Sequence, residues 1–259
     1  MISKYSVIFE EPPVNIPSTF SVDAPLLGNG STGVAIGGPP ENQTYYLARN
    51  DFWRLKESYN ESFPCVLGRL QLAMPALKGA SYRVEQDLYT GTTYQKFEND
   101  IYSVNIRVYV SANEDLLIIE IENEGKGPVK GELVLKIPQE EAADFQSLMS
   151  RNIDRNLQWI SREFNEDVAI PTKAACAMKI MDASSNRFYL KKNETLYVAL
   201  AFSSNFKSGD CSKDVFEKIQ QLAHDSVAAG CGVEEAGDRL YRCTNLRQCS
   251  TARRANQNR

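Results

Sequence analysis

Two pairs of neighbouring carboxylates, Glu114-Asp115 and Glu140-Glu141, are the first candidates for chemistry in this sequence. Acid–base cleavage of a glycosidic bond needs two carboxyl groups held ~5–10 Å apart around the substrate. Residues that are adjacent in the sequence do not supply that separation. We therefore interpret Glu114-Asp115 as a solvated turn and Glu140-Glu141 as favourable charges near the start of a helix. The sequence predicts no catalytic residue.

Histidine and cysteine usage argues against a catalytic triad, a metal centre and a redox centre. His224 is the single histidine, and its place at the end of an expected helix favours a capping role. The six cysteines include no CxxC pair, so no zinc or redox motif is present. We expect thiols rather than disulfides, with Cys65, Cys176 and Cys211 mostly buried. We predict no metal and no cofactor.

Four residues are candidates for contact with a ligand or a partner domain: Asn29, Asn50, Asp51 and Trp53. Asn29 lies in a glycine-rich turn, and Asn50 and Asp51 follow an expected strand, where a turn or capping role is the plainer interpretation. Alternatively, their polar groups could bind sugar hydroxyls or a partner domain. The Trp53 indole could stack on a sugar ring or lie in the core. Trp159 alternates within an expected strand, and we assign it to the core.

The composition is that of an ordinary globular protein. Of the 259 residues, 42% are hydrophobic and 24% are charged, and the net charge is −4. Both signs are spread along the chain, so we expect no nucleic-acid partner, which would need a clustered basic face. No apolar run approaches the ~18 residues of a membrane span, so we expect no membrane partner. Residues 1–13 hold no apolar run of signal-peptide length, and the sequence assigns no location.

Short stretches of alternating polar and apolar residues predict an all-β fold. The clearest is a hairpin in which residues 92–98 and 102–110 flank an Asn99-Asp100 turn. Residues 116–121 are apolar on both faces, which predicts a central strand covered from both sides. Further strands are expected at residues 33–36, 43–48, 70–74, 82–86, 131–137, 156–164, 174–180, 187–190 and 195–202. Many short strands with few helices predict two large, packed antiparallel sheets.

Helical periodicity is confined to two segments. We expect a weak helix over residues 139–151 and a better one over residues 213–224, with Ser212 as its N-cap. No apolar periodicity survives from Cys231 to Arg259. The sequence therefore predicts one domain, residues 1–226, followed by a disordered or off-pattern tail, residues 227–259.

Two short motifs carry a resemblance to a known family. Leu27-Gly28-Asn29-Gly30, with Gly33, forms a tight turn before a strand, and Asn50-Asp51-Phe52-Trp53 follows the next strand. No GKS or GKT sequence follows the glycines, which excludes a phosphate-binding loop. Together with the segment Tyr82 to Leu88, in which Gln86 replaces a leucine of the family, these motifs resemble the amino-terminal domain of glycoside hydrolase families 95 and 65. The resemblance covers roughly residues 5–225.

The resemblance implies a large antiparallel β-supersandwich, similar in fold to galactose mutarotase. In the relatives, which are often secreted or periplasmic, this sandwich is joined to an (α/α)₆ barrel that holds the catalytic carboxylates. The sequence is too short to include such a barrel. The family's aromatic-rich continuation is lost near Ser226, which we interpret as a truncation or a frameshift. We therefore expect an accessory domain of an α-fucosidase-like glycosidase, with a carbohydrate and the missing barrel domain as its partners.

Two other functions stay open. A stand-alone carbohydrate-binding module would present an exposed aromatic platform on one sheet face. A small complete enzyme of mutarotase type is disfavoured, because its acid–base chemistry commonly uses histidines and only His224 is present. If the barrel is missing, an exposed apolar patch should mark where it docks.

Overall fold

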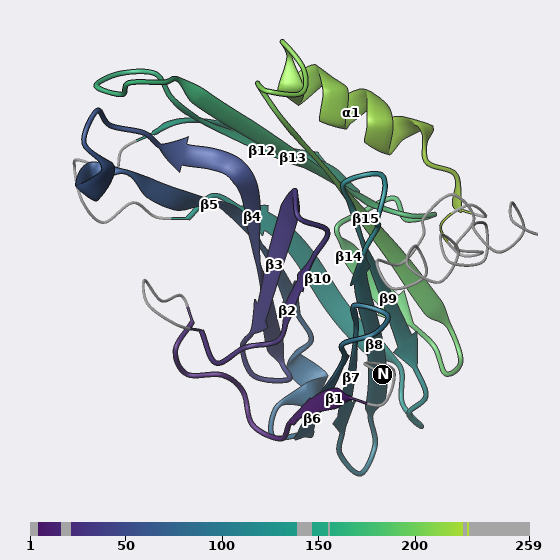
Figure 1. Ribbon diagram of the computed structural model, residues 1–259. Helices are drawn as coiled ribbons and strands as arrows, with labels where there is room; N and C mark the ends of the chain where they lie inside the picture. Colours follow the sequence, from purple (N-terminus) through teal and green to yellow (C-terminus); the bar gives the residue numbers. More distant parts are fainter. Residues whose placement is uncertain (1–4, 17–21, 139–146, 155, 225–226, 228–259) are drawn as a thin grey trace, which may run out of the picture.

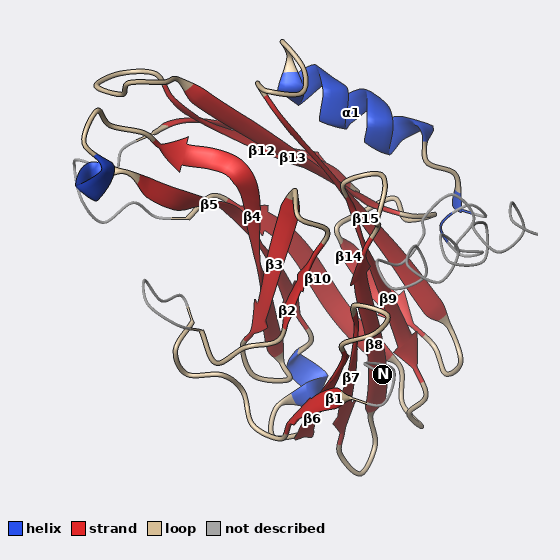
Figure 2. Ribbon diagram, viewed as in Figure 1, coloured by secondary structure: helices blue, strands red, loops and turns tan. Residues whose placement is uncertain are grey.

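The structure is a computed structural model that describes residues 5–16, 22–138, 147–154, 156–224 and 227. In this part of the chain, two antiparallel sheets pack face to face, and one α-helix lies on the outer side of the larger sheet (Figures 1 and 2). The predicted all-β sandwich of two large antiparallel sheets is confirmed.

The larger sheet has nine strands and the smaller sheet has six. In the larger sheet the order is β1 (Ser6–Phe9), β6 (Ser81–Asp87), β7 (Thr92–Glu98), β8 (Ser103–Val110), β9 (Leu116–Asn123), β15 (Thr195–Ser204), β13 (Thr172–Ile180), β12 (Leu157–Phe164) and β11 (Leu148–Asp154). In the smaller sheet it is β14 (Arg187–Leu190), β10 (Val129–Lys136), β5 (Phe63–Ala73), β4 (Asn42–Arg54), β3 (Thr32–Gly37) and β2 (Leu26–Gly28). The 3₁₀ helices η2 (Tyr59–Glu61) and η3 (Pro75–Leu77) flank β5.

Alternating side chains of the two facing sheets build the main core. On β5, the fully buried Leu70 and Leu72 alternate with the half-buried Gln71 and Ala73, as the period of two predicts. The expected hairpin is present as β7 and β8, which pair in register from Thr92 opposite Tyr109 onward. The core therefore lies between the sheets and follows the alternation of the sequence.

A second core lies on the outer face of the larger sheet, beneath α1 (Cys211–Gln221). On β9, Leu117 and Ile119 point into the main core, and Leu116 and Ile118 point into the second core. Residues 116–119 of this strand are buried on both faces, as predicted, whereas Glu120, within the predicted range 116–121, is half-buried on the outer face. Trp159, assigned to the core from its sequence, is half-buried and packs at the edge of this second core.

The predicted helix is present, but its boundaries and its N-cap were wrong. It begins at Cys211 because the carboxylate of Asp210, not the hydroxyl of Ser212, accepts the free backbone N–H of Lys213 at 3.1 Å. It ends at Gln221, and Leu222 is already extended. His224 lies beyond the helix, and its ring packs edge-on against the ring of Tyr197, with the ring centres 5.3 Å apart.

The weak helix expected over residues 139–151 was also wrong at its C-terminal end. Leu148–Asp154 forms strand β11, which pairs with β12 in an unbroken register. Because a short isolated helix is marginally stable, pairing with a neighbouring strand satisfies this backbone better. Glu140-Glu141 and residues 228–259 of the expected tail lie outside the described residues. Cys176 and Cys211 are buried thiols and Cys65 is half-buried, as predicted.

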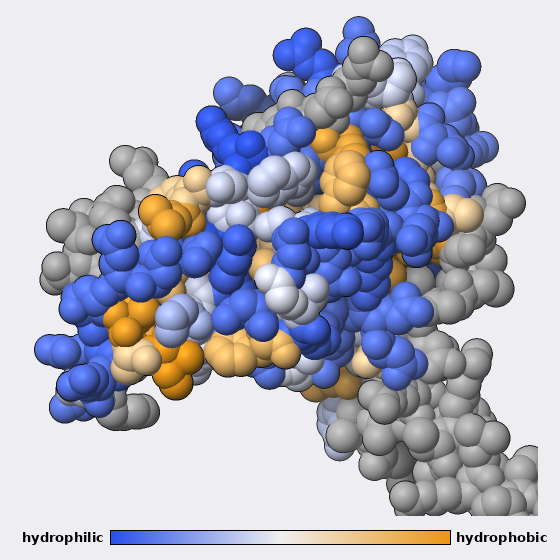
Figure 3. Space-filling view, turned by 90° about the horizontal axis from the view of Figure 1, so that it is seen from above, coloured by the Kyte–Doolittle hydropathy of each residue, from blue (hydrophilic) through white to orange (hydrophobic). Residues whose placement is uncertain are grey.

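The surface mixes polar and apolar side chains. On the face seen from above in Figure 3, hydrophobic residues form several separate patches between hydrophilic ones. Of the helices that the structure describes, none is long and apolar enough to cross a membrane.

Candidate functional site

The two sequence motifs lie against each other at one end of the smaller sheet. The β2–β3 turn and β4 are adjacent because Thr32 pairs with Arg49 across the sheet. The side-chain amide of Asn50 donates to the carbonyl oxygen of Gly30 at 2.7 Å. The structure therefore brings the glycine-rich motif and the Asn-Asp motif into direct contact.

Asn29 links this turn to the larger sheet. Its side-chain oxygen accepts the backbone N–H groups of Ser31 and Thr32, at 3.0 and 2.9 Å. Its amide nitrogen donates to the carbonyl oxygen of Ser111 at 2.8 Å and to the carboxylate of Asp115 at 3.2 Å. The turn itself is made possible by Gly30, whose φ of 90° is readily adopted by glycine. The asparagine thus shapes its own turn and fastens it to the loop between β8 and β9.

Arg49 joins β4 of the smaller sheet to the β8–β9 loop of the larger sheet. Its guanidinium makes two hydrogen bonds to Asp51, of 2.9 and 2.8 Å, and one of 3.1 Å to Asp115. Its side chain has no exposed surface. On the far side, the hydroxyl of Ser204 at the end of β15 donates to Asp51 at 2.6 Å. A hydrogen-bonded chain therefore runs from β15 through β4 to the β8–β9 loop.

We call this cluster the junction; its members are Asn29, Thr32, Arg49, Asp51, Asp115, Ser204 and Lys207. In it, Lys207 forms an ion pair with Asp115, and the hydroxyl of Thr32 donates to the same carboxylate at 3.3 Å. Asp115 itself adopts a left-handed backbone conformation, with φ of 43°. The junction ties the two sheets together through charged hydrogen bonds, which are among the strongest available.

The interpretation of Glu114-Asp115 as a solvated turn was wrong. Asp115 is only 4% exposed, because Arg49 and Lys207 balance its charge inside the fold. Glu114 is half-buried, and its carbonyl oxygen accepts a hydrogen bond from Lys218 of α1. The turn is packed against both the smaller sheet and the helix.

The electrostatics of the junction do not suit acid–base catalysis. Burial raises the pKa of Asp51, but hydrogen bonds from Arg49 and Ser204 outweigh it and hold the pKa below its ordinary value. Burial likewise raises the pKa of Asp115, and hydrogen bonds from Lys207, Asn29 and Arg49 bring it below the ordinary value. A general acid needs the opposite shift, and all four carboxylate oxygens already accept hydrogen bonds. The arrangement suits a structural clamp.

Trp53 lies at the edge of the junction rather than in the core. Its indole N–H donates to the carbonyl oxygen of Asn50 at 2.7 Å, and the side chain is half-buried. All four residues that the sequence singled out are therefore neighbours. Sequence reasoning missed Arg49 and Lys207, and it treated Asp115 as solvated.

No cation-binding cluster is found in the described ranges: no three histidine, cysteine, aspartate or glutamate side chains lie close enough to hold a metal ion there.

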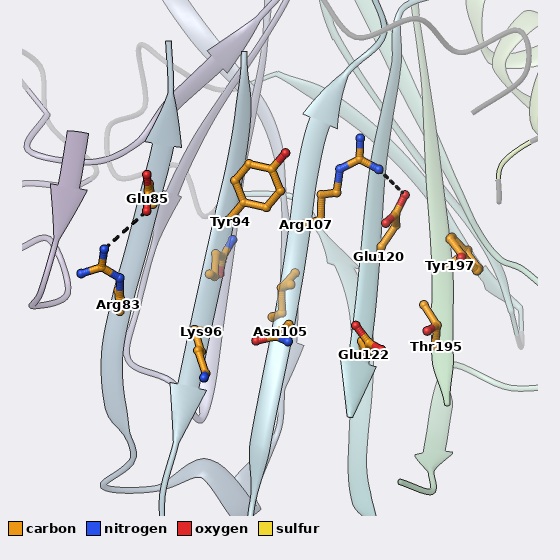
Figure 4. Close-up of a pocket in the computed structure, with 12 residues that line it drawn as sticks. Arg83, Glu85, Tyr94, Lys96, Asn105, Arg107, Glu120, Glu122, Thr195 and Tyr197 are labelled. Atoms are coloured by element: carbon orange, nitrogen blue, oxygen red, sulfur yellow. Dashed lines mark hydrogen bonds and ion pairs between the residues drawn. The ribbon is translucent and has the colours of Figure 1, made fainter. Parts of the chain in front are cut away.

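A groove of about 490 Å³ lies on the outer face of the larger sheet (Figure 4). Two rows of side chains cross five neighbouring strands, as the strand register shows. The first row is Glu85, Tyr94, Arg107, Glu120 and Tyr197, and the second is Arg83, Lys96, Asn105, Glu122 and Thr195. The sequence alone indicated no role for these residues, although their alternation on expected strands placed them on one face.

An apolar groove of about 340 Å³ lies on the outer face of the smaller sheet. Its lining includes Leu26, Ala35, Tyr46, Ala48 and Val66. Leu26 is half exposed.

No protein-family profile and no curated protein sequence matches the chain. Among solved structures, the chain is similar to a protein assigned as a kojibiose phosphorylase from the human microbiome, with a TM-score of 0.47 and 9% identity over 88% of this chain. It is also similar to a family 92 α-mannosidase from Bacteroides thetaiotaomicron, with a TM-score of 0.29 and 8% identity over 80% of this chain. The complex of that α-mannosidase with mannoimidazole gives a TM-score of 0.26 and 8% identity over 80% of this chain. The chain spans about a third of the length of these proteins, 34%, 34% and 33% respectively.

Proposed function

We propose that residues 1–226 are an accessory β-sandwich domain of a carbohydrate-active enzyme related to glycoside hydrolase families 95 and 65. The chemistry belongs to a helical barrel that is not part of this sequence. The proposal rests on the resemblance of the glycine-rich and Asn-Asp motifs, and the antiparallel sandwich agrees with it.

The observation that carries the accessory role is the saturation of the junction. Within the described residues, the carboxylates that the two motifs contain or hydrogen-bond to are those of Asp51 and Asp115. Both have lowered pKa values, and each of their oxygens accepts a hydrogen bond. Residues that are engaged in this way hold two sheets together. They are poor candidates for the proton donor or the nucleophile of sugar cleavage.

The apolar groove beside Leu26 and Tyr46 is compatible with contact to a further domain, because a domain that is normally covered retains apolar surface where its neighbour would lie. The stand-alone carbohydrate-binding module is the second candidate. Its support is the aromatic side chain of Tyr94, which is 45% exposed within a groove.

A turnover assay tests the accessory role. The purified chain is incubated with a panel of aryl glycosides and neutral oligosaccharides, with and without inorganic phosphate, and products are measured by mass spectrometry. We expect neither hydrolysis nor phosphorolysis. Turnover of any substrate by the purified chain would show that this chain holds its own catalytic machinery and would overturn the proposal.

A further inference from the structure

We infer that the groove across β6, β7, β8, β9 and β15 is a binding site for a neutral oligosaccharide. The inference deepens the proposed function and rests on it only in the choice of a sugar as ligand. It assigns a place to the carbohydrate contact, away from the junction that the motifs form.

On the outer face of the larger sheet, the side chains of β9 and β15 change from apolar beneath α1 to polar and aromatic in the groove. On β9, Leu116 and Ile118 lie beneath α1, whereas Glu120 and Glu122 on the same face line the groove. On β15, Ala199 lies in the covered part and Tyr197 lines the groove. Among the described residues, the helix therefore covers the apolar half of the face and does not cover the half that carries aromatic and hydrogen-bonding groups.

The dimensions suit an extended ligand. Four spacings of about 4.8 Å between five neighbouring strands give a length of about 19 Å. The two rows of side chains are separated by two residues along each strand, which is about 7 Å. A volume of about 490 Å³ lies within the usual range of small-molecule sites. A short oligosaccharide chain laid across the strands would contact both rows.

Two tyrosines provide apolar faces within an otherwise polar surface. Tyr94 on β7 is 45% exposed, and its ring stands between Glu85 and Arg107 in the first row (Figure 4). Tyr197 on β15 lies three strands away, at about 14 Å, and its ring is held edge-on against His224. Tyrosine loses little conformational entropy on binding and offers both an apolar face and a hydroxyl. These are the properties that a sugar ring, with its apolar face and hydroxyl rim, requires.

The charges of the groove select against an ionic ligand. Three basic side chains, Arg83, Lys96 and Arg107, stand among three acidic ones, Glu85, Glu120 and Glu122, so the formal charge is balanced. Arg107 pairs with Glu120 at 3.0 Å and Arg83 with Glu85 at 3.4 Å. A polyanion such as a nucleic acid needs clustered basic groups. Sugar hydroxyls, which donate and accept hydrogen bonds, match alternating guanidinium and carboxylate groups.

The test is binding of the full chain to an array of neutral and sulfated glycans, followed by titration with the neutral oligosaccharide that binds best. We expect the Tyr94→Ala variant to weaken the affinity by about tenfold or more and Tyr94→Phe to retain it within about threefold. Tyr189→Ala is the matched control, since this tyrosine is similarly exposed, 51% against 45% for Tyr94, but belongs to β14 of the smaller sheet. The Tyr189→Ala variant should bind the oligosaccharide with the affinity of the wild type.

Three results would overturn the inference: no binding to any neutral glycan, binding to sulfated glycans alone, or equal affinities for the Tyr94→Ala and Tyr189→Ala variants. Circular dichroism and thermal unfolding verify that both variants are folded. Failure here is distinguishable from failure of the proposed function. Absence of glycan binding would refute the groove as a binding site, and the proposed accessory role would stand. Turnover would refute the accessory role, and the groove would still be a candidate binding site.

Discussion

Replacing Arg49 with methionine should lower the free energy of unfolding of the sandwich more than replacing an exposed charged residue does. Methionine keeps much of the length of the side chain and removes its charge. The fully buried guanidinium binds Asp51 and Asp115, whose side chains are only 21% and 5% exposed. Removing one partner of a buried ion pair costs about 3–5 kcal/mol, because the other charge is left without compensation. Lys207 still pairs with Asp115, so we expect a loss near the lower end, about 3 kcal/mol.

The measurement is the free energy of unfolding in urea, followed by the fluorescence of Trp53 and Trp159. Arg187→Met is the matched control. That guanidinium is 77% exposed and lies 3.5 Å from Glu132, so its loss should cost less than about 1 kcal/mol.

The stability of the Arg49→Met variant should also depend on pH differently from that of the wild type. In the wild type, Asp51 and Asp115 have native pKa values below their ordinary value, so their contribution to stability is complete above that value and is lost as the pH falls through the native pKa. Without Arg49, the burial that raises both pKa values is less opposed, and protonation relieves the uncompensated charge. The difference from the wild type should therefore shrink between pH 7 and about pH 4. A deficit equal to that of Arg187→Met, or one that grows in acid, would refute the role of the junction.

Two further substitutions test packing and helix capping. Gly131→Ala would place a Cβ atom 2.3 Å from the ring of Phe188, so we expect a loss of roughly 1–3 kcal/mol in thermal or urea unfolding; Gly209→Ala meets nothing within 4 Å and should be nearly neutral. Asp210→Ala should cost about 1 kcal/mol by removing the N-cap of α1, whereas Ser212→Ala should cost clearly less; the reverse order would restore the serine as the cap.

The strands and their faces could be predicted from sequence because their signal is local. The hairpin of β7 and β8 and the doubly covered β9 follow from the polarity of residues only two positions apart. Leu148–Asp154 could not be predicted in this way, since an edge strand is defined by the partner it pairs with. The cap of α1 was misplaced because Asp210 and Ser212 are both good N-cap residues and stand two positions apart.

The junction shows the limit of the same reasoning for a site. The motifs identified Asn29, Asn50, Asp51 and Trp53, and the structure places them together. The buried ion pair of Arg49 and Asp115, around which these residues are arranged, could not be predicted from the sequence. Asp115 lies 66 residues from Arg49, and nothing near either residue in the sequence indicates that the two meet. An acidic pair in a turn suggests solvent exposure, and only a distant basic partner makes its burial favourable.

The pKa values of Asp51 and Asp115 test most directly whether the motif residues serve the fold or a reaction. They can be measured in the folded chain by following the side-chain carboxyl carbons in a nuclear magnetic resonance pH titration, with each signal assigned from its asparagine variant. We predict that both carboxyls titrate below the ordinary value of 3.8. Titration of either one close to neutral pH, as a general acid requires, would contradict the structural role of the junction.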